Sequence, residues 1–297
     1  MADHYAVIGN PIVQSKSPII HGMFGAATGQ EIEYTKLLSP VHDSADSAET
    51  AAAFEASVRA FMAAGGRGMN VTAPFKLHAY AISDVRSESA TMAGAVNAMK
   101  FIDGKIHVEN FDGVGLLNDI QQNLGVSLAG KRILMLGAGG AVRGALLPFL
   151  SQQPASLVIC SRDLGKAQGL VDEFSALGFA KNADGKSVLA ATTYEILSQR
   201  SGSAGGFDVV LNATSASLTT DLPPIDASLF AGCALAYELA YGKGLTPFLK
   251  LAKTAGVPQI ADGVGMLAEQ AAEAFEWWRG IRPQTRAVIE QLTVPLI

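Results

Sequence analysis

The sequence predicts an α/β protein with two domains, and three observations support this prediction. Its 297 residues are more than one hydrophobic core usually supports. Short apolar runs alternate with segments of helical periodicity, which is typical of largely parallel strands joined by helices. Apolar residues make up 49% of the chain and charged residues 16%, so a large core is expected and a disordered chain is excluded.

The first half of the chain alternates strand and helix patterns. Ser17 and Pro18 predict a helix start, with serine as the N-cap and proline in the first turn. Asp103-Gly104 predicts a hairpin turn. In order, we expect a strand at 5–9, a helix from Ser17, a helix at 49–64, a strand at 68–72, short helices at 77–85 and 87–93, and a strand at 95–101.

The second half continues the alternation. Residues 198–206, rich in serine and glycine, are expected to form a mobile loop. In order, we expect a helix at 114–124, a strand at 131–136, a helix that ends at Phe149, a strand at 157–160, a helix at 166–177, a strand at 208–212, and a helix along 266–278 that returns to the first domain.

Charge and composition exclude several classes of partner. With a net charge of −5 there is no basic stripe for nucleic acid, so we expect none to bind. No apolar run is long enough to span a bilayer, and no secretory signal is recognisable, so a cytoplasmic location is expected. Cys160 and Cys233 stand singly in apolar settings and predict buried thiols, with no metal site. A monomer and a homodimer are both open.

A glycine-rich turn follows the apolar strand at 131–136 and opens a helix, the context of a dinucleotide fingerprint. Gly137 permits the tight turn, Gly139 lets the backbone approach a pyrophosphate, and the helix N-terminus offers unpaired N–H groups. The full turn is Gly137, Ala138, Gly139, Gly140 and Ala141. The alternative is an ordinary strand-to-helix turn.

The residues that follow the next strand favour NADP. Where an acidic side chain would bind the ribose of NAD, the chain has Ser161. Arg162 can stack on adenine and pair with a 2′-phosphate, and Lys166 can add a second positive charge. Asp163 opposes this reading, so NAD stays open as a secondary cofactor, and Arg162 taken alone could equally be a solvated surface charge.

Two charged residues stand out on irregular segments of this charge-poor chain. Lys76 ends the stretch Asn-Val-Thr-Ala-Pro-Phe-Lys, and Asp112 precedes a glycine. A lysine, an aspartate and a nicotinamide cofactor suffice to reduce a ketone. The alternatives are a solvated loop lysine and a turn aspartate. Ser15 and Ser17 place two hydroxyl groups at a helix start, where a carboxylate could bind.

Six motifs, in order and over nearly the whole chain, resemble those of the shikimate dehydrogenase family. They are Gly9-Asn10-Pro11 with Ser15-Lys16-Ser17-Pro18, Asn70-Val71-Thr72 with Pro74-Phe75-Lys76, Gly94-Ala95-Val96-Asn97, Asp112-Gly113-Val114-Gly115, Asn212-Ala213-Thr214-Ser215, and Asp262-Gly263-Val264-Gly265-Met266. The resemblance implies NADPH-dependent reduction of 3-dehydroshikimate to shikimate, on the way to chorismate and the aromatic amino acids.

The resemblance also implies an architecture and site roles. It implies a discontinuous substrate domain at 1–111 plus 262–297 and a Rossmann-like NADP-binding domain at 112–261, with the substrate cleft between them. Because the chain crosses twice between the domains, we expect them to close around a hinge near Asp112 and near residues 237–262. Lys76 and Asp112 would be the catalytic pair. Ser15 and Ser17 would bind the substrate carboxylate; Thr72, Asn97, Tyr237 and Gln270 would bind its hydroxyl groups or carboxylate; Asn212, Thr214, Gly263 and Met266 would lie near the nicotinamide. Read without the family, Asn97 could satisfy backbone groups, Tyr237 could be core, and Gln270 could be a helix-surface residue.

Three positions depart from the family pattern. Phe111 stands where threonine is usual, Glu238 where aspartate is usual, and Ser161-Arg162-Asp163 where Asn-Arg-Thr is common. Phe111 and Asp163 keep open a shikimate/quinate dehydrogenase paralogue that uses NAD. A non-catalytic nucleotide-binding regulator is the alternative from another class, although it has no need of Lys76 and Asp112 together.

Overall fold

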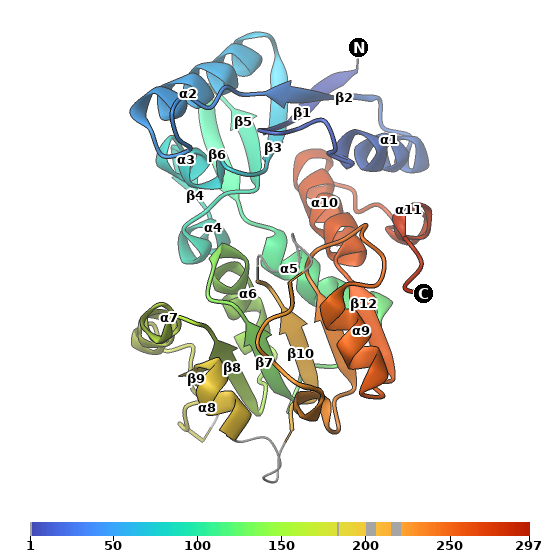
Figure 1. Ribbon diagram of the computed structural model, residues 1–297. Helices are drawn as coiled ribbons and strands as arrows, with labels where there is room; N and C mark the ends of the chain where they lie inside the picture. Colours follow the sequence, from blue (N-terminus) through green and yellow to red (C-terminus); the bar gives the residue numbers. More distant parts are fainter. Residues whose placement is uncertain (1, 183, 200–205, 215–220) are drawn as a thin grey trace. The chain divides into compact units, whose positions relative to one another are not determined.

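The computed structural model describes residues 2–182, 184–199, 206–214 and 221–297. It divides into two compact units (Figure 1). Unit 1 comprises Met1–Gly115 and Ala268–Val288, and unit 2 comprises Leu116–Leu267 and Ile289–Ile297. The boundaries expected after residues 111 and 261 stay a prediction about how the functional domains divide.

Unit 1 is built on a mixed sheet with the order β2-β1-β3-β5-β6-β4. Its strands are β1 (Asp3–Gly9), β2 (Ile32–Leu38), β3 (Gly66–Val71), β4 (Val85–Arg86), β5 (Ala98–Ile102) and β6 (Lys105–Glu109). β1 pairs in parallel with β2 and β3, whereas β5 runs antiparallel to β3 and β6. β4 also pairs in parallel with β6, so the expectation of largely parallel strands is confirmed. The turn at Asp103-Gly104, with φ of 50° and 74°, closes the expected antiparallel hairpin between β5 and β6.

The helices of unit 1 differ from expectation at two places. They are α1 (Ser17–Thr28), α2 (Ala48–Ala63), α3 (Lys76–Ala81), α4 (Glu88–Ala93) and, from Ala268, α10 (Val264–Arg279), with α11 (Arg286–Leu292) beginning in this unit. Lys16 is the N-cap of α1 and no side chain caps it, so the capping role expected for Ser17 is wrong. The helix expected at 77–85 ends at Ala81, because Val85 pairs with His107 in the sheet.

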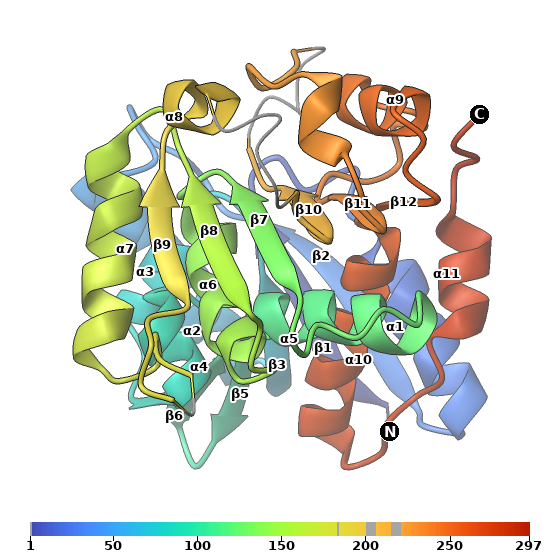
Figure 2. The same cartoon turned by 90° about the horizontal axis from the view of Figure 1, so that it is seen from below.

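Unit 2 is a six-stranded sheet in which every pair is parallel, with the order β12-β11-β10-β7-β8-β9. The strands are β7 (Arg132–Leu136), β8 (Ser156–Cys160), β9 (Leu189–Thr192), β10 (Val209–Asn212), β11 (Leu235–Glu238) and β12 (Gln259–Asp262). Figure 2 shows β7, β8 and β9 side by side, with α7 (Leu164–Ala176) along β9. The strand order reverses between β7 and β10, and open α/β sheets bind ligands at the carboxyl ends of such a switch point.

The remaining helices of unit 2 connect these strands. They are α5 (Asp112–Asn118), which begins in unit 1, the π-helix η1 (Asp119–Asn123), α6 (Gly140–Leu150), α8 (Tyr194–Gln199), the 3-10 helix η3 (Ala227–Phe230) and α9 (Pro247–Thr254). The helix expected at 114–124 is thus α-helical first and π-helical at its end. The loop expected at 198–206 falls largely outside the described residues.

Both cysteines are buried free thiols, as expected. Burial raises the pKa of Cys160 to about 12 and that of Cys233 to about 11, so neither is a reactive thiolate near neutral pH. In the part of the chain that the structure describes, no helix is long and apolar enough to cross a membrane.

Candidate active site

Lys76 and Asp112 meet in unit 1. β3 ends at Val71, a short turn follows, and Lys76 opens α3, where its carbonyl oxygen accepts a 3.0 Å hydrogen bond from the Val96 N–H group. Asp112 opens α5 after β6. The Lys76 Nζ atom donates to Asp112 Oδ2 in an ion pair, and the two side chains are 34% and 18% exposed. Both charged side chains are therefore partly buried and partly exposed.

Asn97 holds this pair in place. Its side chain is buried, and its Nδ2 atom donates to Asp112 Oδ1 at 2.8 Å and to Gln270 Oε1 at 3.3 Å. Its Oδ1 atom accepts from the Phe111 N–H group at 2.8 Å. The structure thus brings four of the expected site residues, Lys76, Asp112, Asn97 and Gln270, into one hydrogen-bonded cluster, with Phe111 as a backbone partner.

The expected carboxylate-binding serines lie close to each other. The Ser15 hydroxyl donates to the Ser17 hydroxyl at 3.3 Å, and the Ser17 N–H group donates to Ser15 Oγ at 3.4 Å. Ser15 is half-buried and Ser17 is buried.

Thr72 is also half-buried and follows β3, the strand beside β1. A Cβ atom at Gly9, the last residue of β1, would lie 2.4 Å from the Cγ2 atom of Thr72. Gly9 is therefore needed for the approach of the two strand ends.

A buried network that contacts Asn97 was not predicted from the sequence. The His21 ring stacks on Tyr34 with centroids 4.3 Å apart, and His21 Nε2 and the Tyr34 hydroxyl lie 3.0 and 2.6 Å from Asn70 Oδ1. Asn70 Nδ2 donates to the Asn97 carbonyl at 3.2 Å. Burial lowers the pKa of His21 to about 3, although the hydrogen bond to Asn70 opposes this. His21 is therefore neutral and donates from Nε2. A polar Asn70 in a strand pattern was the only sequence signal.

A pocket of about 800 Å³ opens in unit 2 at the carboxyl ends of β7, β8 and β10. Gly137 has a φ of 113°, and a Cβ atom there would lie 3.1 Å from the Ala213 carbonyl oxygen, so glycine is required. A Cβ atom at Gly139 or Gly140 would meet no atom within 4 Å, which leaves the N-terminus of α6 open. This open, positively polarised turn fits a pyrophosphate.

Ser161, Arg162, Asp163 and Lys166 line the same pocket. The Asp163 side chain is the N-cap of α7 and accepts from the Lys166 N–H group at 3.2 Å, while the Asp163 N–H group donates to Ser161 Oγ at 3.2 Å. Asp163 is thus engaged in capping a helix. The exposed Arg162 and Lys166 side chains are the cationic groups at this wall, which suits a phosphorylated ribose.

The other expected cofactor residues are distributed unevenly. Ala138 and Thr214 line the pocket with Gly137 and Gly139, whereas the exposed Gly140 and Ala141 are not among its described lining residues. Asn212 is buried, donates to Glu238 Oε2 at 3.0 Å and accepts from the Thr214 hydroxyl at 2.8 Å. Asn212 therefore orients Thr214, and the unusual Glu238 orients Asn212.

Tyr237, Gly263 and Met266 lie together in unit 2. Tyr237 is completely buried, and its hydroxyl donates to Asp119 Oδ2 at 2.7 Å and accepts from the Met266 N–H group at 3.3 Å. A Cβ atom at Gly263 would lie 2.1 Å from the Leu239 carbonyl oxygen. Tyr237 as a substrate ligand stays a prediction; its hydroxyl is engaged within the core here.

No cluster of three or more metal-ligating side chains occurs among the described residues.

Comparisons with known proteins show similarity over nearly the whole chain. A model described as the shikimate dehydrogenase substrate binding domain matches residues 7–99, and one described as the shikimate 5′-dehydrogenase C-terminal domain matches residues 263–293. A shikimate dehydrogenase (NADP(+)) of Nitrosospira multiformis is 46% identical over 292 residues, 98% of each chain. The crystal structure of an Ael1 enzyme from Pseudomonas putida has 55% identity and a TM-score of 0.89 over all of both chains. Shikimate 5-dehydrogenase from Thermus thermophilus, solved with NADP(H) and shikimate, has 28% identity and a TM-score of 0.80 over 97% of each chain.

Proposed function

Since the chain belongs to the shikimate dehydrogenase family, we propose that it catalyses the reversible NADP-dependent reduction of 3-dehydroshikimate to shikimate. The observation that carries this proposal is the cluster of Lys76, Asp112, Asn97 and Gln270, in which an ammonium group is held by a carboxylate whose second oxygen is also bound. A positioned acid beside a nicotinamide cofactor suffices to reduce a ketone.

Lys76 acts on the oxygen of the reacting carbonyl. Its ammonium group has three donors, one of which is directed to Asp112. A remaining donor stabilises the developing alkoxide and protonates it, and in the oxidative direction the amine accepts that proton. NADPH, when bound, supplies the hydride. Asp112 keeps the ammonium in position and accepts a hydrogen bond from a substrate hydroxyl.

The other site residues bind the substrate. Ser15 and Ser17 donate hydroxyl groups to its carboxylate, and Thr72, Asn97 and Gln270 bind its ring hydroxyls. The role proposed for a tyrosine is better suited to Tyr241 than to Tyr237. Tyr241 is 42% exposed and follows the carboxyl end of β11, whereas Tyr237 is 0% exposed.

The cofactor is NADP, and NAD stays open as a secondary cofactor. Arg162 and Lys166 are exposed at the pocket wall and can pair with a 2′-phosphate, and the carboxylate of Asp163 is occupied at the N-cap of α7. Gly137, Ala138, Gly139, Gly140 and Ala141 bind the pyrophosphate. The nicotinamide half lies against Asn212, Thr214, Gly263 and Met266. A cytoplasmic enzyme is supported by two free, buried thiols, and monomer and homodimer both fit.

Initial rates followed by nicotinamide absorbance test this proposal. Shikimate and quinate are each combined with NADP and NAD, for the wild type, Lys76→Ala and the control Lys105→Ala, whose side chain is exposed on β6. Turnover of shikimate with NADP that is lost only in Lys76→Ala is expected. Predominant turnover of quinate with NAD would assign the chain to the paralogue, and cofactor binding without turnover would favour the regulator.

A further inference from the structure

The side chain of Tyr237 joins two segments of unit 2 that are far apart in sequence. Its hydroxyl donates to Asp119 Oδ2 at 2.7 Å, 118 residues away in the chain, and accepts from the Met266 N–H group at 3.3 Å. Burial, together with the Asp119 carboxylate, raises the pKa of Tyr237 well above its ordinary value. The phenol therefore keeps its proton and donates a hydrogen bond to the Asp119 carboxylate.

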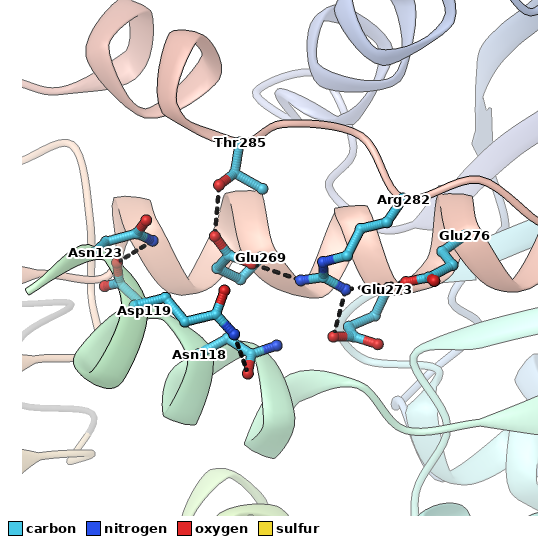
Figure 3. Close-up of polar contacts among 9 residues, drawn as sticks. Asn118, Asp119, Asn123, Glu269, Glu273, Glu276, Arg282 and Thr285 are labelled. Carbon is cyan, nitrogen blue, oxygen red and sulfur yellow. Dashed lines mark hydrogen bonds and ion pairs between the residues drawn. The ribbon is translucent and has the colours of Figure 1, made fainter. Parts of the chain in front are cut away.

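Asp119 is held from a second side as well. It is 3% exposed and is the first residue of the π-helix Asp119–Asn123, which continues α5. The Asn123 side chain donates to Asp119 Oδ1 at 2.9 Å, the contact drawn in Figure 3. π-Helical turns inside helices are rare and often occur at functional sites. Asn123 binds one oxygen of the Asp119 carboxylate and Tyr237 binds the other, so both carboxylate oxygens are bound.

The first turn of α10 packs directly on this carboxylate. A Cβ atom at Gly265 would lie 1.9 Å from Asp119 Oδ1 and 2.1 Å from its Cγ atom, so only glycine fits. The N–H groups in the first turn of a helix have no partner within the helix. The Tyr237 hydroxyl satisfies the one at Met266, and the buried carboxylate lies beside the positive end of the helix, where negative charge is favourable.

We infer that Asp119 and Tyr237 are positioning residues for the nicotinamide end of the cofactor site. Through the Tyr237 hydroxyl, Asp119 fixes the backbone of Met266 and thereby the place of the Met266 side chain against the nicotinamide ring. The inference rests on the proposed function, because it takes from it both the binding of NADP in unit 2 and the position of the nicotinamide against Met266. Tyr237 then acts through another residue and has no contact with the substrate.

Calorimetric titration with two ligands tests this inference. One ligand is NADP, and the other is adenosine 2′,5′-bisphosphate, which has the adenine, the ribose and the 2′-phosphate but no nicotinamide half. In Tyr237→Phe the Kd for NADP should rise about fivefold, the effect of losing one net hydrogen bond, and the Kd for the fragment should be unchanged. Asp119→Asn should act in the same direction. Tyr80→Phe, in unit 1, is the matched control.

The two ligands separate positioning from stability. A general loosening of unit 2 would weaken both ligands equally in Tyr237→Phe, and that result, or no change with either ligand, would overturn the inference. If Asp119→Asn fails to fold, Tyr237→Phe alone decides, because it removes one hydroxyl group and keeps the ring. Wild-type protein that binds neither ligand would instead overturn the proposed function.

Discussion

Lys76 and Asp112, 36 residues apart in the chain, form an ion pair whose second carboxylate oxygen accepts a 2.8 Å hydrogen bond from Asn97. The carboxylate is thereby fixed at both oxygens. It cannot rotate away from Lys76 without also losing Asn97. The ammonium group is consequently preorganised for a carbonyl oxygen, which is the condition for a positioned acid.

Lys76 and Asp112 should behave as one unit in a double-mutant cycle. Lys76→Ala should lower kcat for shikimate by about 100- to 10,000-fold, the usual contribution of a positioned acid or base. Asp112→Ala should lower it similarly, and the double variant should lose little more, because each group needs the other. Steady-state rates check this, with Lys105→Ala as the control. Losses that multiply would show that the two residues act independently.

Phe111 should set the affinity for the substrate. Its ring packs edge-on against Trp277 with centroids 5.9 Å apart, and its N–H group donates to Asn97 Oδ1 at 2.8 Å. Phe111→Thr should lower KM for shikimate about fivefold, because a hydroxyl group is added beside Asp112. It should also cost about 1 to 2 kcal/mol of unfolding free energy through lost apolar contact.

A partly buried phenylalanine elsewhere in unit 1 gives the matched control. Phe101 packs against Phe61 with centroids 6.4 Å apart, and Phe101→Thr should reduce stability without changing KM. An unchanged KM in Phe111→Thr would remove Phe111 from the substrate site.

Asp163 should stabilise helix α7 and should have no effect on the preference for NADP over NAD. Asp163→Ala removes an N-cap and should cost about 1 kcal/mol of unfolding free energy, whereas Asp163→Ser keeps a capping oxygen and should cost little. The ratio of kcat/KM for NADP over NAD should be the same in the wild type and Asp163→Ser. A rise in that ratio would mean that the carboxylate repels the 2′-phosphate.

Arg162 and Lys166 should carry the preference for NADP. Arg162→Ala should lower kcat/KM for NADP by about tenfold or more, because a charge-assisted contact with phosphate is lost, and should change the value for NAD much less. Lys166→Ala should also lower kcat/KM for NADP, but by a smaller factor, because the lysine ammonium is a point charge on a flexible stem. Equal losses with both cofactors would indicate stacking on adenine as the main role of Arg162.

His21 should make the fold sensitive to acid. Its pKa is about 3 in the folded protein and about 6.5 in the unfolded chain, so between these values only the unfolded chain binds the proton. Stability is complete above about pH 6.5 and falls as the pH decreases towards 3. From pH 7 to 5 the loss should be about 2 kcal/mol, measured by denaturant unfolding.

His21→Gln should remove that part of the pH dependence, because the replacement side chain does not titrate. His4→Gln, with a His4 side chain that is 52% exposed, is the control and should retain it. Identical pH profiles for the wild type and His21→Gln would contradict the assignment.

Local patterns allowed much of the fold to be anticipated. The glycine turn after an apolar strand, the short helices and the Asp103-Gly104 hairpin were all predictable, because turn chemistry and periodicity act over a few residues. The predicted helix end at Val85 was wrong because pairing of that residue with His107 outweighs its local helical pattern. The capping role of Ser17 was wrong because the helix begins one residue earlier than its sequence signal suggests.

By itself the sequence determined which chemical groups are present and which segments could form turns, cap helices or contribute to the core. Only the tertiary structure decided which of them meet. Asn97 donates a hydrogen bond to Gln270, 173 residues away in the chain. The sequence left Tyr237 open as a core residue or a substrate ligand, and in the structure its hydroxyl donates to Asp119 in the core. The physical reason is that such contacts depend on strand order and on the packing of segments distant in sequence. Local propensity depends on a few neighbouring residues and carries no information about either.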